Sequence, residues 1–207
     1  AFVTSHDLQE PLRMISSFMD QLKRNYGDQL DDKALQYIHF ARDGAIRMKQ
    51  IILDLLEYSR AGRPTESKKQ VDVNETINEF KQLRRKIISE KSVTIATSKL
   101  PVIHCYKAAF TQVLHSLLDN AIKYTKKGVE PHIKLAAKEK EVHWEFSIKD
   151  NGIGIEPKFH DKIFVIFQRL HNRKEYDGTG IGLSIAKRHV EFLGGNIWLK
   201  SSPDKGT

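Results

Sequence analysis

Cysteine is almost absent from the sequence, which has a single one, Cys105, among 207 residues. A lone cysteine excludes a disulfide-stapled scaffold and suits a reducing compartment, so the sequence predicts a cytoplasmic chain. Apolar runs long enough to span a membrane are also missing, as is a recognisable signal peptide. We therefore expect any sensor or membrane anchor to lie outside this stretch, whose length allows one or two domains with real cores.

Acidic residues are fewer than basic residues, but only in the second part of the chain. The formal net charge is +8; residues 1–60 carry 8 Lys/Arg and 9 Asp/Glu, which leaves 26 and 17 for residues 61–207. The surplus favours an anionic ligand in the second part. A nucleic-acid binder should show a basic stripe with interleaved aromatics. The most basic segment, 81–91, instead has Leu83, Ile87 and Ile88 at core spacing, so we expect a solvated helix face and no nucleic-acid partner.

The first 60 residues hold two apolar stripes at helical spacing, separated by turn residues over 27–32. Two such helices joined by a short turn cannot bury both stripes alone. We expect a helical hairpin that pairs with a second copy into a four-helix bundle, which makes the protein a homodimer. The stripes consist of Phe2, Leu8, Leu12, Ile15, Met19, Leu22 and Tyr26, and of Leu35, Ile38, Ala41, Ala45, Met48, Ile52 and Leu55.

A polar linker over 61–70, containing Gly62 and Pro64, is expected to separate this hairpin from a second domain over 71–207. Helices and strands mix in the second domain, which predicts an α/β sandwich with helices on one face of a mixed sheet. We expect Asn74 to cap the first of its helices. The expected helices are 75–91, 108–124 and 183–193, and the expected strands are 71–74, 92–96, 102–106, 132–137, 142–149 and 196–200.

Two glycine-rich clusters give this second domain its chemistry. Val142, Trp144, Phe146 and Ile148 share one face of a half-buried strand, which ends at the first cluster, Asp150-Asn-Gly-Ile-Gly-Ile155. The carboxylate needs a hydrogen-bonding partner, and glycines let backbone approach a flat ligand closely. The second cluster, Gly178-Thr-Gly-Ile-Gly-Leu183, opens a helix whose first N–H groups attract phosphate. Together they predict a nucleotide site; their separation does not fit a dinucleotide-binding βαβ unit.

Five segments, in order, resemble the sequence boxes of sensor histidine kinases. They are Ser5-His-Asp-Leu-Gln-Glu-Pro-Leu12, similar to the phosphohistidine box of phytochrome-type members, Leu117–Tyr124 (N box), Asp150–Gly154, Phe164–Phe167 (F box) and Gly178–Leu183. The resemblance covers nearly the whole chain and implies a catalytic ATPase domain of the GHKL type with the Bergerat fold. It also implies ATP and Mg²⁺ as cofactors, and the receiver domain of a response regulator as partner.

On the helix expected over 108–124, Ser116, Asn120 and Lys123 lie along one side. Asn120 offers a neutral oxygen to Mg²⁺, Lys123 meets phosphate charge, and Tyr124 packs near adenine. Ser116 departs from the family, where asparagine is common. The expected nucleotide-binding residues are Asn120, Lys123, Tyr124, Asp150, Gly152, Gly154, Ile155, Phe167, Gly178, Thr179, Gly180, Ile181, Gly182 and Leu183.

His6 is the expected phosphoacceptor. A neutral imidazole is a competent nucleophile near physiological pH, and the adjoining Asp7 can hold Nδ1–H so that Nε2 attacks phosphorus. Glu10, four residues on, stands where many relatives have Thr or Asn, which predicts weak phosphatase activity. Residues 156–177 are expected to form a lid anchored by Phe164 and Phe167, from which Arg169, His171 and Arg173 are candidates to approach the γ-phosphate.

Two other function classes stay open at this point. One is an ATP-driven clamp like the gyrase and chaperone branches of the superfamily, although Ser116 stands where those branches carry their water-activating carboxylate. The other is a non-catalytic dimerisation module that binds a partner through the hairpin, although the acceptor, metal and glycine positions are intact. Autophosphorylation within a subunit and across the dimer are equally compatible with the sequence.

Overall fold

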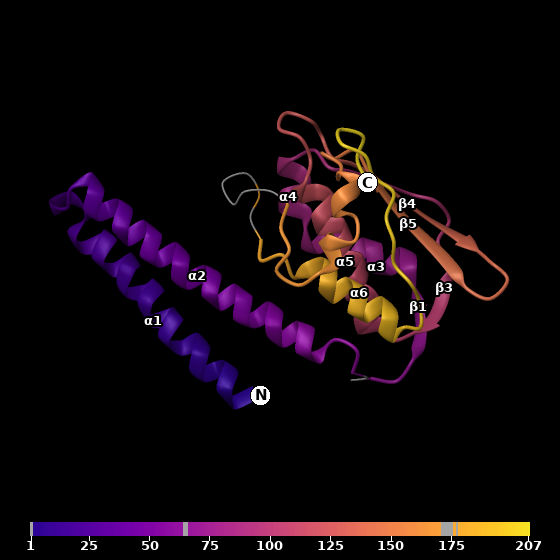
Figure 1. Ribbon diagram of the computed structural model, residues 1–207, viewed down its shortest axis with the longest axis horizontal. Helices are drawn as coiled ribbons and strands as arrows, with labels where there is room; N and C mark the ends of the chain where they lie inside the picture. The colour runs from indigo at the N-terminus through magenta and orange to yellow at the C-terminus, as the bar shows by residue number, and fades with distance from the viewer. Residues whose placement is uncertain (1, 64–65, 171–175, 177) are drawn as a thin grey trace. The chain divides into compact units, whose positions relative to one another are not determined.

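The computed structural model describes residues 2–63, 66–170, 176 and 178–207, with side chains from residue 7 onward. The chain divides into two compact units, residues 1–60 and residues 61–207 (Figure 1). Among the described residues, no helix is both long enough and apolar enough to cross a membrane.

The first unit is a hairpin of two long helices, α1 (Phe2–Tyr26) and α2 (Asp32–Arg60), joined through the short helix η1 (Gly27–Gln29). The second helix starts where Asp31 Oδ1 accepts a hydrogen bond from the Ala34 N–H at 2.7 Å, because the first N–H groups of a helix need an outside acceptor. Arg42 Nε donates to Asp20 Oδ1 at 2.7 Å and so joins the two helices. The predicted helical hairpin is confirmed, and α1 runs on through Pro11.

Most apolar side chains of the hairpin face outward. Leu12 and Ala45 are its buried hydrophobic residues in the described part of the unit. Large side chains of both expected stripes are at least a third exposed, as are several beside them. These side chains are Leu8, Met14, Ile15, Phe18, Leu22, Tyr26, Tyr37, Phe40, Ile46, Met48, Leu53 and Leu55. A two-helix unit has no second layer to cover such a surface, so the hairpin is an incomplete core.

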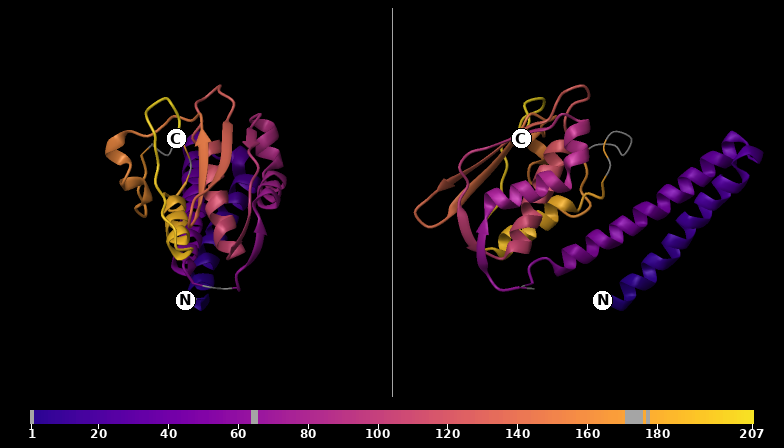
Figure 2. Two further views of the ribbon diagram at one scale, coloured as in Figure 1. Left: turned by 90° about the vertical axis from the view of Figure 1, so that its right-hand side faces the viewer. Right: turned by 180° about the vertical axis from the view of Figure 1, so that it is seen from behind.

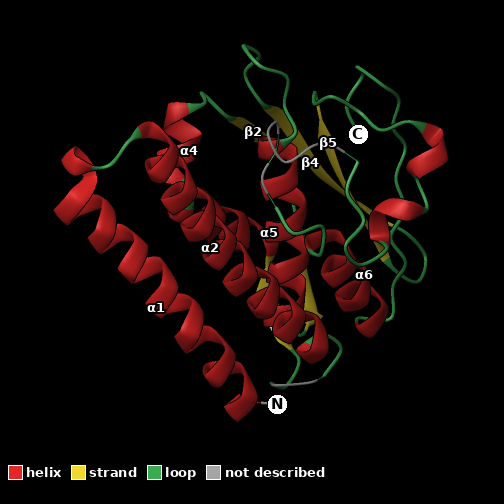
Figure 3. Cartoon of the chain, turned by 60° about the vertical axis from the view of Figure 1, so that its left-hand side comes forward, coloured by secondary structure: helices red, strands yellow, loops and turns green. Residues whose placement is uncertain are grey.

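The second unit is an α/β sandwich. Its main sheet has the strand order β2 (Thr94–Thr97), β4 (His132–Glu139), β5 (Trp144–Asp150), with β2 parallel and β5 antiparallel to β4. A separate antiparallel pair is formed by β1 (Lys69–Asp72) and β3 (Val102–Cys105). Helices α3 (Val73–Leu83), α5 (Lys107–Lys123) and α6 (Gly182–Phe192) cover one face of the strands (Figure 3). The predicted sandwich with a mixed sheet is confirmed.

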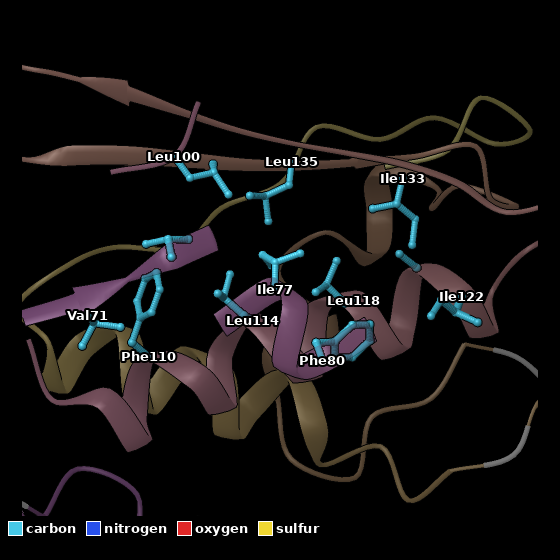
Figure 4. Packing of buried hydrophobic residues seen from close by; sticks show 12 residues of the cluster. Val71, Ile77, Phe80, Leu100, Phe110, Leu114, Leu118, Ile122, Ile133 and Leu135 are labelled. Atoms are coloured by element: carbon cyan, nitrogen blue, oxygen red, sulfur yellow. The ribbon is translucent and has the colours of Figure 1, made fainter. Parts of the chain in front are cut away.

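The core lies between the strands and helices α3 and α5, and Figure 4 shows its side chains converging from both layers. Phe80 of α3, Leu118 of α5 and Leu135 of β4 are fully buried. The apolar positions of α5 recur every three or four residues, which turns one face of that helix to the sheet. The opposite side of α5 is thereby free to carry polar groups. The buried cluster consists of Val71, Val73, Ile77, Phe80, Leu100, Phe110, Leu114, Leu118, Ala121, Ile122, Ile133 and Leu135.

Two expectations about the first helix of this unit are wrong. The expected helix 75–91 is two helices, α3 and α4 (Arg85–Glu90), separated at Arg84. Arg84 leaves helical geometry and forms a two-pronged ion pair with Asp119 of α5, at 2.8 and 2.9 Å. The cap is Asp72 rather than Asn74, because Asp72 Oδ1 accepts the Asn74 backbone N–H at 2.7 Å. Hydrogen bonds from the Asn74 side-chain amide and from its backbone N–H both lower the pKa of Asp72.

Four further expectations fail at the edges of the sandwich. Residues 196–200 alternate in exposure but form no strand, and the expected single sheet is two. The expected strand 142–149 instead runs from Trp144 to Asp150, and Val142, which precedes it, is 89 % exposed. The β4–β5 hairpin extends beyond the helices of this unit (Figure 2). Leu83, expected at core spacing, is 65 % exposed because α3 ends there.

Phe80 and Leu83, one turn apart on α3, provide a matched test of this packing. Phe80→Ala is expected to lower the free energy of unfolding by about 3–5 kcal/mol, because it leaves a cavity in the core. Leu83→Ala is expected to change it by less than about 0.5 kcal/mol, because that side chain is exposed. Urea denaturation of both variants measures the difference; equal effects would contradict the described orientation of α3.

Candidate functional site

Asp150 is the last residue of β5, and one of its two carboxylate oxygens is hydrogen-bonded to backbone N–H groups. Oδ1 accepts hydrogen bonds from the Gly152 N–H at 2.8 Å and from the Thr207 N–H at 3.1 Å. Oδ2 has no hydrogen-bond partner among the described residues. Burial raises the pKa of Asp150, and the two backbone donors oppose that rise. A fixed carboxylate with one oxygen left over can accept a proton donor from a ligand.

The first glycine cluster wraps tightly around this carboxylate. A Cβ on Gly152 would lie 2.6 Å from the Tyr124 carbonyl oxygen and 2.9 Å from Asp150 Oδ1. Gly154 has φ +70°, and a Cβ there would collide with the Ser202 carbonyl group. The Ile153 N–H donates to Tyr124 O at 2.9 Å, and Ser201 Oγ accepts from the Ile155 N–H at 2.8 Å. These two glycines are required by the close approach of the Tyr124 and Ser202 backbone, whereas the sequence analysis expected them to make room for a ligand.

The last residues of the chain belong to the same site, and the sequence analysis missed them. Thr207 accepts from the Asp150 N–H at 2.9 Å and donates its own N–H to Asp150 Oδ1. Gly206 has φ +79°, and a Cβ there would strike the Asp150 carbonyl group. Ser201 Oγ joins Gly206 O at 2.8 Å and Thr207 Oγ1 at 2.9 Å. The adjacent pair Gly206-Thr207 was the sequence feature that could have pointed to these residues.

The polar side of α5 lies along the second glycine cluster. Ser116 Oγ donates to Gly182 O at 2.9 Å, and at the other end Lys123 Nζ lies 2.6 Å from where a Gly178 Cβ would stand. Asn120, between them, is half-buried, and its side-chain amide makes no hydrogen bond within the described chain. Lys123 Nζ also sits over the Tyr124 ring, 4.4 Å from its centroid. Ser116, Asn120 and Lys123 therefore share one side of the helix, as their spacing predicts.

Helix α6 begins inside the second cluster. Gly178 and Gly180 have φ +136° and +79°, a backbone region that other residues rarely adopt. Ile181, the N-cap residue, is fully buried, and its side chain makes no capping hydrogen bond. As in any helix, the first N–H groups of α6 have no intrahelical acceptor and carry partial positive charge, which suits phosphate oxygens. Thr179 is half-buried, Gly182 is exposed, and Leu183 is half-buried.

The described part of the expected lid contains two short helices, η2 (Pro157–Phe159) and η3 (Lys162–Phe164). Arg169, a candidate for the γ-phosphate, instead donates to two backbone carbonyls, Tyr176 O at 2.8 Å and Gly178 O. Tyr176 packs on Tyr124 with ring centroids 5.1 Å apart and donates to Thr125 O at 3.3 Å. Phe164 is half-buried, whereas Phe167 is half exposed with φ +64°.

Other expected residues lie on the hairpin or outside the described residues. His6 lies on α1, but its side chain is outside the described residues, and Asp7 is exposed. His171 and Arg173 also lie outside the described residues. Among the described side chains there is no group of three or more His, Cys, Asp or Glu residues that would hold a metal ion. A metal here would rest on the Asn120 amide oxygen together with ligand oxygens and water, a donor set that suits Mg²⁺.

Known families cover most of the chain. Residues 3–64 match the profile described as "His Kinase A (phospho-acceptor) domain", and residues 105–207 match "Histidine kinase-, DNA gyrase B-, and HSP90-like ATPase". The chain belongs to the histidine kinase family. Both domains of an ATP-dependent histidine kinase are therefore present, in the order that the sequence boxes predict.

Related proteins agree with this assignment. Cyanobacterial phytochrome A of Nostoc sp. is 39 % identical over 206 residues, which is 100 % of this chain and 27 % of that protein. Sensor protein kinase WalK of Staphylococcus haemolyticus is 33 % identical over 212 residues, 98 % of this chain and 34 % of that one. The kinase chain thus spans about a quarter to a third of the length of these relatives.

Solved histidine kinases share the fold. The structure of full-length ShkA in complex with AMPPNP superimposes with a TM-score of 0.71 at 25 % identity, over 99 % of this chain and 43 % of that one. The kinase ThkA, in complex with the response regulator protein TrrA, gives a TM-score of 0.63 at 23 % identity, over 98 % of this chain and 57 % of that one. A hairpin followed by a GHKL-type ATPase sandwich is the common architecture.

Asp150→Asn tests the base pocket of the kinase. The variant is expected to weaken ATP binding more than GTP binding, because Asp150 is expected to accept the adenine amino proton, and mismatched donors leave buried polar groups unpaired. Its apo domain is expected to be at least as stable at neutral pH, because a raised carboxyl pKa means that the folded state disfavours the charge. Titration with both nucleotides and a thermal melt measure this. Equal loss for ATP and GTP would contradict the assignment.

Ser116 provides a second test within the site. Ser116→Ala removes the hydrogen bond to Gly182, which is worth about 0.5–1.5 kcal/mol, so the start of α6 is held less firmly. ATP affinity should fall by roughly two- to ten-fold while the melting of the hairpin stays unchanged. Ser116→Thr keeps the hydroxyl and is the control. An affinity unchanged in Ser116→Ala would show that this bond does not support nucleotide binding.

Proposed function

We propose that this chain is the catalytic region of a sensor histidine kinase. In this proposal the hairpin of residues 1–60 dimerises and carries the phosphoacceptor His6, residues 61–70 connect, and residues 71–207 bind ATP. The phosphoryl group taken by His6 passes to an aspartate on the receiver domain of a response regulator, in a cytoplasmic setting. The observation that carries the proposal is the pairing of two features in a chain with a phosphoacceptor domain. One is Asp150, whose second carboxylate oxygen has no hydrogen-bond partner among the described residues; the other is the α6 start, where the N-cap residue Ile181 makes no side-chain hydrogen bond.

Nucleotide binding is supported by the chemistry of the two ends of this site. Asp150 Oδ2 accepts the amino group of the base, and Gly152, packed against the Tyr124 carbonyl oxygen, holds the carboxylate in place through its N–H. Lys123 and the first N–H groups of α6 meet the phosphates, and Asn120 holds Mg²⁺ through its amide oxygen. Bound Mg²⁺ neutralises charge on the phosphates during transfer. The structure of full-length ShkA in complex with AMPPNP supports nucleotide binding by this chain.

The phosphoryl acceptor and its neighbour are assigned by their chemistry. Asp7 holds Nδ1–H of His6, which leaves the Nε2 lone pair directed at phosphorus and stabilises the positive charge that develops on the ring. The contribution of the chain to catalysis is then mostly positioning and charge stabilisation. No receiver aspartate is proposed within the chain, so a second protein takes the phosphoryl group.

Dimerisation is supported by the exposed apolar surface of the hairpin. Phe18 and Phe40 are 53 % and 59 % exposed, and both helices present further large apolar side chains. Burying such a surface against a second copy completes a four-helix core at about 25 cal/mol per Å² of apolar area removed from water. The same hairpin is where a response regulator would approach His6.

Incubation with γ-labelled ATP tests the function directly. The chain is expected to gain acid-labile, base-stable label, as a phosphohistidine does, and His6→Gln is expected to lose it completely. Asn120→Ala should lose most of the label because metal and phosphate are no longer positioned. Release of phosphate without labelled protein would instead identify an ATPase clamp, and the absence of both would identify a non-catalytic module. Mixed dimers of the two variants distinguish transfer within a subunit from transfer across the dimer.

Phosphatase activity is predicted to be weak because of Glu10. This carboxylate is 53 % exposed with Arg13 at 3.6 Å, one turn from His6 on α1. A charge at about 4 Å from an anionic phosphoryl group costs about 1 kcal/mol in water and about 4 kcal/mol at an effective dielectric of 20. Such barriers slow hydrolysis of the phospho-regulator roughly five- to a thousand-fold.

Glu10→Thr, which restores a residue common in relatives, is therefore expected to raise hydrolysis of purified phospho-regulator at least roughly five-fold, measured with a non-hydrolysable ATP analogue. Glu10→Gln, which removes only the charge, is the companion variant. Rapid hydrolysis by the unaltered chain, unchanged in Glu10→Ala, would contradict the role given to this residue.

A further inference from the structure

The segment that follows the hairpin is attached to the second unit at both of its ends. Arg188, in the middle of α6, donates its Nε–H to the Ala61 carbonyl oxygen at 2.8 Å, and Ala61 is 1 % exposed. Gly62 adopts φ +86°, and its Cβ position lies 3.7 Å from Arg188 Nε and 3.9 Å from Phe192 Cβ. Phe192 in turn packs on Tyr106 with ring centroids 4.9 Å apart. The first two residues of the expected linker, Ala61 and Gly62, thus pack on α6.

A second attachment lies at the start of α5. The side chain of the N-cap residue, Tyr106, makes no capping hydrogen bond, so the first N–H groups of α5 need another acceptor. Glu66 Oε1 accepts the Ala108 N–H at 2.6 Å, while Glu66 Oε2 pairs with Lys69 Nζ at 2.9 Å. The backbone hydrogen bond also lowers the pKa of Glu66. The Glu66 carboxylate, which belongs to the linker, therefore caps α5 in place of the Tyr106 side chain.

We infer that Arg188 is a positioning residue for phosphoryl transfer, because it fastens the linker to the helix that begins at the phosphate-binding glycines. Arg188 lies six residues after Gly182 on α6, about 9 Å along a rigid helix. The flexible part of the connection is then confined to the junction with α2, and residues 61–62 move with the ATP-binding unit. This inference rests on the proposed kinase function.

The physical consequence is a higher effective concentration of bound nucleotide at the phosphoacceptor. A tethered encounter weakens roughly as the −3/2 power of the flexible length once the tether is longer than the span requires. Releasing Ala61 from Arg188 lengthens the free tether by the stretch between Ala61 and Glu66. The nucleotide contacts at the other end of α6 are left in place, so transfer and ATP affinity should separate.

Arg188→Ala in the full chain tests the attachment, with Lys187→Ala as the matched control. Lys187 is the preceding residue, 48 % exposed, and pairs loosely with Glu191 at 3.9 Å. Trypsin cleavage after Arg60, read as release of fragment 1–60 by mass spectrometry, should accelerate roughly ten-fold in Arg188→Ala, because a hydrogen bond that protects the Ala61 backbone is lost. The next basic residue, Arg63, precedes Pro64 and resists trypsin. Lys187→Ala should cleave as the unaltered chain does.

The kinetic measurement is the rate of autophosphorylation at saturating ATP, together with the affinity for an ATP analogue. Arg188→Ala should lose roughly two- to five-fold in rate with unchanged affinity. Gly62→Ala, strained at φ +86°, should show the same pattern and serves if Arg188→Ala fails to fold. Unchanged cleavage, or faster cleavage with an unchanged or higher rate, would overturn the inference. An unaltered chain that incorporates no label would overturn the kinase function itself, while the trypsin result would still report on the attachment.

Discussion

The structure depends on helix α5, which packs into the core with one side and carries polar groups of the candidate site on the other. Its apolar face packs Phe110, Leu114 and Leu118 against the sheet and supplies the centre of the core. Because the helix cannot rotate without exposing that face, the side chains opposite are fixed as well. Ser116 and Lys123 are therefore held against the second glycine cluster by the packing of the opposite face, and Asn120 lies between them on the same side of the helix. The hydrophobic core therefore sets the geometry of the proposed nucleotide site.

Asp150 is likewise held in place by contacts within the protein. Its backbone and one carboxylate oxygen are held by Gly152 and Thr207, so the strand end is rigid before any ligand arrives. The raised pKa shows that burial of this charge opposes folding of the empty domain. A group kept at such a cost to stability is typical of a binding site.

Periodicity and short motifs predicted the hairpin, the sandwich and both glycine clusters, because these features repeat within a few residues. Contacts between distant segments escaped prediction. The partner of Ser116 is Gly182, and the cap on α5 comes from Glu66; neither pairing has a local signal. Adjacent candidates were also indistinguishable: Asp72 and Asn74 both cap helices well, and only the backbone geometry selects Asp72. Residues 196–200 alternate like a strand but lack ladder bonds to a neighbour, which a single-chain pattern cannot reveal.

The two units differ in where their apolar surface goes. The sandwich buries its own core, whereas the hairpin leaves residues such as Phe18, Tyr37 and Phe40 exposed. A unit completed by a second copy has a stability that follows protomer concentration, while a self-contained unit does not. In the proposed dimer, dilution would therefore separate the paired hairpins first and leave folded sandwich domains that could still bind nucleotide. The number of copies per cell would then set a threshold below which nucleotide binding persists without signalling.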